Sequence, residues 1–298
     1  MEKLRVFTAF SGYDSQCLAL DRLKSNYPSF DYELVGWSEI DKYAIQAHNA
    51  LYPQWADRNY GDISKIDWSQ VPDFDLFTYS SPCQDFSNAG LQRGGEEGSG
   101  TRSSLLWECR RAIIAKRPKY LLLENVAALV SKKFLPLFNK WQTELANYGY
   151  NNFAQVLNAS DYGVPQNRER VFLVSILDVA SYHFPQPFTL QSRLKDVLER
   201  SVDEKYYLSD KILAGFNRTS QDASHRHTFT PKSGDDTAFA LRTSAGTRVD
   251  DNFIQEPLNP DRGGLCRTIK AQYYKNGRAN FKQQGGHGAT GVIEYDNG

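Results

Sequence analysis

The sequence predicts an α/β fold with a doubly wound, mostly parallel sheet. Up to about residue 180, short apolar runs alternate with amphipathic stretches, which is typical of successive β–α–β units. The chain has 298 residues, enough for one large α/β domain with a smaller appendage. Past Pro185-Gln-Pro187 the alternation stops and polar residues with glycine dominate. We therefore predict a regular domain over residues 1–180, followed by a linker and an irregular region over 181–298.

The apolar runs and the helical spacing locate the individual elements. The predicted strands are Arg5–Phe10, Glu33–Trp37, Asp75–Tyr79, Tyr120–Leu123, Asn152–Leu157 and Val171–Ile176. The predicted helices carry apolar residues at three- and four-residue spacing and are Ser15–Lys24, Lys42–Leu51, Ser104–Lys116 and Phe134–Asn147. Helices between the strands would cover both faces of the sheet.

Charge and cysteine usage exclude several classes of protein. The chain has 35 basic and 35 acidic side chains, so it does not resemble a protein that coats nucleic acid without a local basic surface. Its four cysteines form no Cys-x-x-Cys pair, which disfavours a zinc site or a disulfide framework and favours a reducing cytoplasm. We expect no bound metal. The sequence has neither a signal-peptide pattern nor an apolar run long enough to span a bilayer, so we expect no membrane role.

The turn after the first strand is a candidate cofactor site. Phe10-Ser11-Gly12 precedes a helix, and exposed backbone N–H groups there could hold an anion or a nucleoside. The turn lacks the three glycines of a dinucleotide fingerprint, and a plain strand-to-helix turn is an equal alternative. Glu39 follows the second strand and could accept hydrogen bonds from a ribose, while Asp62 could accept one from an adenine amino group. Each acid alone would more often be a surface or capping residue, but together they favour a nucleoside site.

A thiol follows the third predicted strand. Cys83 lies between Pro82, which stiffens the turn, and Gln84, and Ser87 follows closely. A lone cysteine is usually a small buried apolar residue. These polar neighbours could instead support a thiolate nucleophile.

An acid and two arginines follow later strands. Glu124 comes after three leucines and before Asn125, so partly apolar surroundings would fit it to donate a proton. The alternative is a strand-end acid paired with a lysine such as Lys119. Arg168 and Arg170 could decorate a sheet edge, or could fix a base edge or a carboxylate in a bidentate manner.

The irregular region contains one basic and aromatic stretch. Residues 264–293 include Arg267 and Lys275, with tyrosines and a phenylalanine between the basic side chains. This composition suits phosphate contacts and base stacking, although an ordinary solvated loop has a similar composition.

Through these motifs, the chain resembles the DNA cytosine-5 methyltransferases. Phe10-Ser-Gly12 is similar to their cofactor loop and Pro82-Cys83-Gln84 to their nucleophile loop. Glu124-Asn125-Val126 is similar to their acid motif, and the segment from Gln166 to Arg170 to their arginine motif. The order and spacing of the four motifs cover about residues 5–176.

The resemblance implies a Rossmann-like catalytic domain over residues 1–180, with a partial target-recognition region after it. It implies that Cys83 adds to carbon 6 of a cytosine flipped out of DNA, that Glu124 acts at N3, and that Arg168 holds Glu124 or the base carbonyl, with Arg170 beside it. S-adenosylmethionine would lie on Phe10, Ser11, Gly12, Glu39, Ile40, Asp62, Ile63, Pro82 and Leu105. Double-stranded DNA would meet Gln84, Ser87, Asn125, Gln166, Arg267 and Lys275.

Two departures from the family pattern leave alternatives open. Asp14 and Ser15 stand where the family usually has glycines, and the chain ends before the family's C-terminal helix. We therefore expect a truncated chain, or one subunit of a split enzyme whose second polypeptide supplies the missing motifs. The alternatives are a cytosine-5 methyltransferase acting on transfer RNA and a catalytically inactive nucleic-acid-binding subunit.

Overall fold

The computed structural model describes residues 2–82, 102–178, 181–198, 211, 215, 231–239, 253–255 and 268–270. The chain divides into two compact units. The first comprises Met1–Leu157 and Glu169–Pro185, and the second comprises Asn158–Arg168 and Gln186–Gly298.

The first unit is built on a six-stranded sheet with the strand order β2-β1-β3-β4-β7-β5. These strands are β1 (Leu4–Ala9), β2 (Tyr32–Ser38), β3 (Leu76–Tyr79), β4 (Tyr120–Val126), β5 (Tyr150–Asn158) and β7 (Glu169–Leu177). The pairs β1–β2, β1–β3 and β3–β4 are parallel, and β4–β7 is antiparallel. The predicted α/β class with a mostly parallel sheet is thus confirmed.

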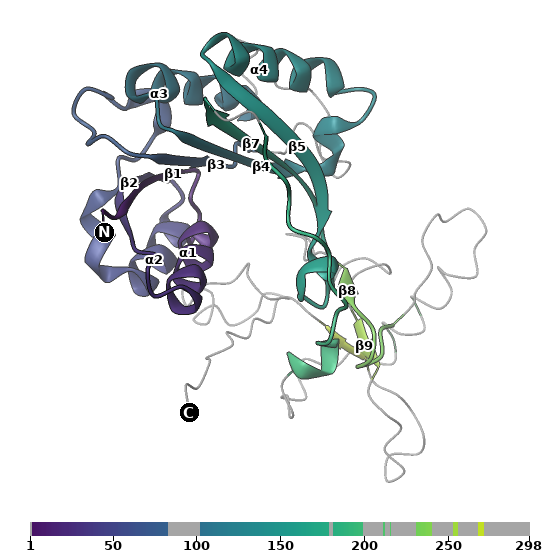
Figure 1. The fold of residues 1–298 in the computed structure, drawn as a ribbon. Helices are drawn as coiled ribbons and strands as arrows, with labels where there is room; N and C mark the ends of the chain where they lie inside the picture. Colours follow the sequence, from purple (N-terminus) through teal and green to yellow (C-terminus); the bar gives the residue numbers. More distant parts are fainter. Residues whose placement is uncertain are drawn as a thin grey trace. The chain divides into compact units, whose positions relative to one another are not determined.

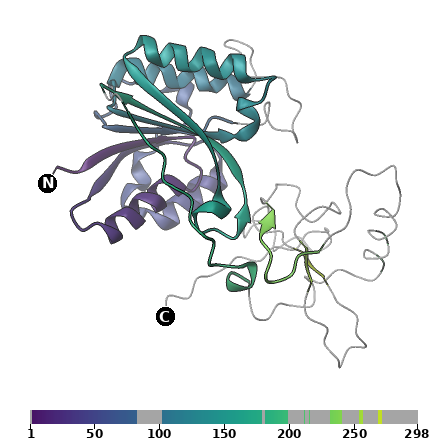
Figure 2. The same cartoon turned by 45° about the vertical axis from the view of Figure 1, so that its right-hand side comes forward.

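Helices cover both faces of this sheet (Figures 1 and 2). They are α1 (Ser15–Asn26), α2 (Lys42–Leu51), α3 (Cys109–Lys116) and α4 (Leu135–Asn147). Figure 1 shows α1 and α2 on one face and α3 and α4 on the other. The predicted helix 104–116 was wrong in its first part, because Arg102–Glu108 forms a 3₁₀ helix and α3 begins only at Cys109. Consecutive serines at 103 and 104 are weak helix formers, and they fall in this segment.

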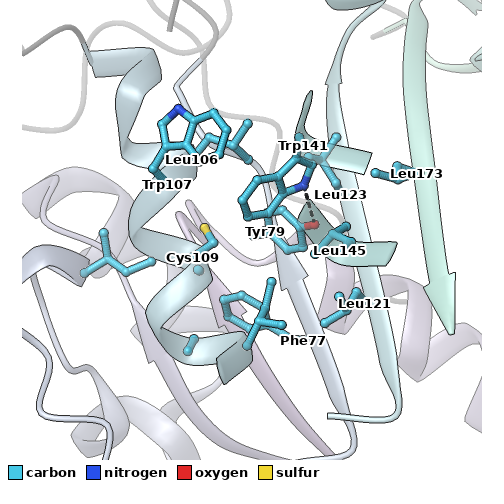
Figure 3. Close-up of a cluster of buried hydrophobic side chains, with 14 of the residues drawn as sticks. Phe77, Tyr79, Leu106, Trp107, Cys109, Leu121, Leu123, Trp141, Leu145 and Leu173 are labelled. Atoms are coloured by element: carbon cyan, nitrogen blue, oxygen red, sulfur yellow. Dashed lines mark hydrogen bonds between the residues drawn. The ribbon is translucent and has the colours of Figure 1, made fainter. Parts of the chain in front are cut away.

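Alternation along the strands divides the core between the two faces. On β1, Val6 packs with residues of α1 and β2, whereas Phe7 joins the larger cluster on the opposite face. In the larger cluster, Trp141 of α4 lies against Tyr79 of β3, and its Nε1 donates a hydrogen bond to the tyrosine Oη over 3.1 Å (Figure 3). This contact attaches α4 to the last residue of β3.

The second unit contains short strand pairs. β6 (Gln166–Asn167) is parallel to β8 (Ala238–Phe239), and β9 (Phe253–Gln255) is antiparallel to β10 (Thr268–Lys270). Leu194, from the 3₁₀ helix Leu194–Asp196, packs with Ala238 and Ile254 in a small apolar cluster. None of the helices in the described ranges has the length and apolar character that a membrane span requires.

Candidate active site

Strand register brings the expected site segments to one edge of the sheet. Ala9 pairs with Ser38 of β2 and with Tyr79 of β3, and Tyr79 pairs with Leu123 of β4. The residues that follow in the chain are therefore neighbours along this edge. They are Phe10, Glu39, Ser80 and Glu124.

The turn after β1 is held against the end of β2. The backbone N–H of Ser11 donates to the carbonyl of Ser38 over 3.2 Å, and that of Gly12 donates to Oε2 of Glu39 over 3.0 Å. Gly12 has a φ of 60°, in the left-handed region that glycine adopts without a steric penalty. The other oxygen of Glu39 accepts from the N–H groups of Ile40 and Asp41, at 2.7 and 2.9 Å. Glu39 thus fixes both its own loop and the β1 turn.

Asp62 lies on the next segment along this edge. The chain before it is attached to β2, because Ser38 Oγ donates to the carbonyl of Gly61 over 2.6 Å. The carboxylate of Asp62 accepts from the hydroxyl and the N–H of Ser64, and these hydrogen bonds lower the pKa of Asp62 below its usual value. It therefore stays ionised at neutral pH and can accept a further hydrogen bond. Ile63 is only 2% exposed, and its side chain packs in the core.

An arginine of α3 joins the Asp62 segment to the helix that follows the Leu105 segment. Arg111 donates from Nη1 to the carbonyl of Ser64 over 2.8 Å and from Nη2 to that of Ile66 over 3.0 Å. Leu105 lies in the 3₁₀ helix directly before α3, and its side chain is half-buried. Arg111 was not singled out from the sequence, because a helical arginine gives no sign of the carbonyl groups it will meet.

These residues fit a nucleoside cofactor. A Cβ placed on Gly12 would meet no described atom within 4 Å, so space lies open at the turn. The hydroxyl of Ser11 is buried and has no hydrogen-bond partner among the described atoms. Beside them, Ile40 is 71% exposed and offers an apolar surface for a base. The turn, the two acids and Ile40 thus supply the polar and apolar contacts that a nucleoside needs.

Glu124 is paired with an arginine of the antiparallel strand. Arg170 Nε lies 2.9 Å from Glu124 Oε1, and the two side chains are 20% and 27% exposed. Glu124 is opposite Phe172 in the β4–β7 register, and Val126 is opposite Arg170, so Glu124 and Arg170 are diagonal neighbours on one face. From the sequence, we expected Arg168 to hold either Glu124 or the base carbonyl in place. The observed ion pair is made by Arg170, because β7 begins at Glu169 and its register places Arg170 beside the acid.

Asn125 contacts the chain that leads to Cys83. Asn125 is 2% exposed, and its Nδ2 donates to the carbonyl of Ser81 over 3.1 Å. Its Oδ1 accepts from the N–H of Val126 over 2.9 Å. The amide side chain therefore joins the end of β4 to the segment Ser81-Pro82 after β3. We interpreted Asn125 as a DNA contact; the structure gives it this internal connection.

The remaining expected residues fall elsewhere. Cys83, Gln84, Ser87, Arg267 and Lys275 lie outside the described residues. Gln166 and Arg168 belong to the second unit, where Gln166 pairs with Ala238 and the Arg168 N–H donates to Asn158 Oδ1 over 2.9 Å. Within the described ranges, no three His, Cys, Asp or Glu side chains are grouped as metal ligands.

Comparisons with known proteins show the family to which the chain belongs. A family model described as C-5 cytosine-specific DNA methylase matches residues 4–291. Type II methyltransferase M2.ScrFI of Lactococcus lactis subsp. cremoris is 40% identical over 259 aligned residues, and the match covers 70% of this chain and 71% of that protein. Type II methyltransferase M.NlaX of Neisseria lactamica is 34% identical, with 86% of this chain and 73% of that protein covered.

A solved structure shares the fold. The Dnmt2 methyltransferase of S. pombe matches with a TM-score of 0.67 at 20% identity, covering 87% of this chain and 78% of that chain. At this identity the likeness concerns the fold alone. The family model and the two bacterial relatives carry the assignment further: this chain belongs to the C-5 cytosine-specific DNA methylase family.

Proposed function

We propose that this chain transfers a methyl group from S-adenosylmethionine to carbon 5 of a cytosine flipped out of double-stranded DNA. Beside the family membership, one observation supports the proposal. The Glu124–Arg170 pair, on β4 and β7, lies at the edge of the sheet where β1 and β2 end and the turns after them begin. An acid for the base and a fitting nucleoside site thus share one edge of the sheet.

The cofactor would be held by residues of four successive segments at that edge. The turn after β1 offers open space at Gly12 and the hydroxyl of Ser11, which has no hydrogen-bond partner among the described atoms. Glu39 and Asp62 would accept hydrogen bonds from the ribose and the adenine amino group, and Ile40 would contact the base. The residues proposed for this role are Phe10, Ser11, Gly12, Glu39, Ile40, Asp62, Ile63, Pro82 and Leu105. When bound, S-adenosylmethionine supplies an electrophilic methyl group.

The chemistry at the cytosine follows from the weakness of carbon 5 as a nucleophile. The target base must leave the duplex to reach protein side chains. Addition of the Cys83 thiolate to carbon 6, with a proton from Glu124 shared with N3, converts the ring to an enamine whose carbon 5 is nucleophilic. Carbon 5 would then form a bond to the methyl group as the bond between that group and the cofactor sulfur breaks, so that S-adenosylhomocysteine would leave. Loss of the carbon 5 proton to solvent, elimination of the thiolate and return of the N3 proton to Glu124 release the methylated base.

The cations and amides have supporting roles in this proposal. Arg170 keeps the Glu124 carboxyl group oriented through their ion pair. Arg168 is left to contact the base carbonyl. Gln84, Ser87, Gln166, Arg267 and Lys275 would contact DNA, and the two basic residues would neutralise phosphates.

The test is transfer of a labelled methyl group from S-adenosylmethionine to amplified, unmodified DNA of mixed sequence, with a transfer RNA pool as a parallel substrate. We expect label in DNA as 5-methylcytosine and none in an adenine–thymine copolymer, which contains no cytosine. If only the transfer RNA were labelled, the substrate would be RNA and the DNA proposal would be wrong. DNA binding and cofactor binding without transfer would instead indicate the inactive subunit.

Asn125→Ala tests whether the connection from β4 to Ser81 supports catalysis. The variant loses the hydrogen bonds to Ser81 and Val126, and leaving a buried partner unsatisfied lowers the free energy of unfolding by about 1–3 kcal/mol. Because Ser81 and Pro82 directly precede Cys83, we expect kcat to fall at least about tenfold, or about 1.4 kcal/mol in activation free energy. The measurements are thermal unfolding and the rate of methyl transfer at saturating substrates.

Asn152→Ala is the matched control. Asn152 also connects a strand to other elements, since it donates to the carbonyl of Gln142 and accepts from Ser175. Its partner Ser175 is opposite Leu121 in the β4–β7 register, three residues before Glu124. The Asn152 contacts therefore lie away from the candidate site. We expect a comparable loss of stability with normal kcat. Equal rates for the two variants would remove Asn125 from the catalytic proposal.

A further inference from the structure

Asp14 ends the β1 turn in a backbone conformation that side chains rarely adopt. Its φ is 69° and its ψ is 60°, and Phe10 and Gly12 in the same turn also have positive φ values, of 55° and 60°. Aspartate tolerates this left-handed region better than most residues, but the conformation still needs support from its surroundings. The Asp14 N–H donates to the carbonyl of Ser11 over 2.8 Å and so closes the turn.

The carboxylate of Asp14 is fully buried and fully engaged. Oδ2 accepts a hydrogen bond from Thr8 Oγ1 of β1 over 2.8 Å, and Oδ1 accepts one from the N–H of Cys17 in the first turn of α1, over 3.2 Å. One side chain thus joins the last part of β1 to the start of α1 around the turn. A buried carboxylate of this kind is stable only when every oxygen has a partner.

His48 of α2 faces this carboxylate. Its Nε2 lies 3.6 Å from Asp14 Oδ2 and has no hydrogen-bond partner among the described atoms. The ring is fully buried and stacks on Trp37 of β2, with the ring centroids 3.7 Å apart. Its Nδ1 lies 3.3 Å from Asn49 Oδ1. The Nε2 atom thus faces the Asp14 carboxylate while the ring is held against Trp37.

The pair is connected to the cofactor turn from both sides. Asp14 closes the turn at its end. Trp37, which stacks on the His48 ring, directly precedes Ser38, the last residue of β2, and Glu39, which follows that strand. Those two residues accept the N–H groups of Ser11 and Gly12. Movement of Asp14 relative to His48 would therefore displace the backbone of the turn beside the open space at Gly12.

We propose that Asp14 and His48 form a buried pair that positions the turn Phe10–Gly12 for S-adenosylmethionine. The inference rests on the proposed function, because it assumes that the cofactor binds at this turn. Neither residue touches the cofactor in this account, so both are positioning residues. The pair takes over, with a side chain, the conformational role that a glycine at residue 14 would fulfil by its backbone alone.

Three substitutions separate these two ways of holding the turn. Asp14→Gly permits the same φ without strain but removes the carboxylate. Asp14→Asn keeps the size and a cap for Cys17 but removes the charge. His48→Phe keeps the stacking on Trp37 but leaves Asp14 without its facing group. If backbone freedom at residue 14 were sufficient, Asp14→Gly would bind the cofactor normally.

The experiment is calorimetric binding of S-adenosylmethionine to the 298-residue chain, with KM for the cofactor and kcat measured beside it. We expect each substitution to weaken binding at least about tenfold and to raise KM, with kcat at saturating cofactor changed much less. Because the two residues act together, the double variant Asp14→Asn/His48→Phe should bind about as weakly as either single variant.

Val6→Ala is the control for stability alone. Val6 is fully buried on β1 in the same core cluster as Cys17 and Trp37, but it is not part of the turn. Its loss should lower the unfolding temperature and leave KM unchanged. Normal cofactor affinity in Asp14→Gly and His48→Phe, with binding intact in the unmodified chain, would overturn the inference alone. An unmodified chain that binds no S-adenosylmethionine would overturn the cofactor site and this inference together.

Discussion

Cys83→Ser is expected to abolish methyl transfer and to prevent the covalent complex with DNA that contains 5-fluorocytosine. Fluorine at carbon 5 cannot leave as a proton does, so an enzyme that has added to carbon 6 stays attached to the base. A serine hydroxyl is far less ionised than a thiol at neutral pH and should not add at a measurable rate. Denaturing gel electrophoresis of the complex and a methyl-transfer assay measure the two effects.

The two cysteines within the described residues, Cys17 and Cys109, make poor nucleophiles. Cys17 and Cys109 are fully buried, and burial raises the pKa of both thiols above the usual value. Figure 3 shows Cys109 among the apolar side chains of the core, including Phe77 and Trp107. Cys109→Ala is therefore the matched control, and it should form the covalent complex normally. A complex formed by Cys83→Ser but lost in another cysteine variant would show that the nucleophile was misassigned.

Glu124→Gln is expected to lower the rate of methyl transfer by about a hundredfold, which corresponds to about 3 kcal/mol of transition-state stabilisation. Glutamine can still donate a hydrogen bond toward a base, but it cannot deliver a proton to N3 as the enamine forms. The loss should appear in the single-turnover rate constant for methyl transfer, with DNA affinity nearly unchanged. Near-normal turnover would remove Glu124 from the mechanism.

The observed ion pair adds a second arm to that experiment. If Arg170 acts only by orienting Glu124, then Arg170→Gln should slow the natural enzyme but have little further effect on Glu124→Gln. Full additivity of the two effects would instead mean that Arg170 contacts the substrate itself. Arg168→Gln, compared in the same way, would report on the base-carbonyl role that remains proposed for Arg168.

Local sequence patterns predicted most of the catalytic fold. The helix Lys42–Leu51 has the predicted bounds, and the strand positions follow from apolar runs because burial on both faces of a parallel sheet needs them. The 3₁₀ segment before Cys109 was not predicted, because its apolar spacing is also compatible with an α-helix. The antiparallel direction of β7 was not predicted either, since strand direction is set by connections rather than by composition.

The candidate site could be predicted as a set of residue types but not as a set of contacts. The order of the motifs predicted that Glu124 and an arginine would lie close together. Only the register of β4 and β7 shows that the arginine paired with Glu124 is Arg170. Likewise, Asp14 was interpreted as a departure from a glycine-rich turn. Its contacts with Thr8 and Cys17, and the approach of His48 from α2, depend on tertiary packing that one-dimensional spacing does not contain.

The alternation at the end of β4 limits how the lengths of these segments can change during evolution. Glu124 and Asn125 point to opposite sides of the strand, one toward Arg170 and the other toward Ser81. Inserting or deleting a single residue within β4 would exchange the two, leaving an amide beside the arginine and a carboxylate against a backbone carbonyl. Loops after the strands can grow or shrink without that penalty. Natural variants of this chain should therefore differ in loop length while the strands keep theirs, which leaves binding specificity free to diverge around fixed chemistry.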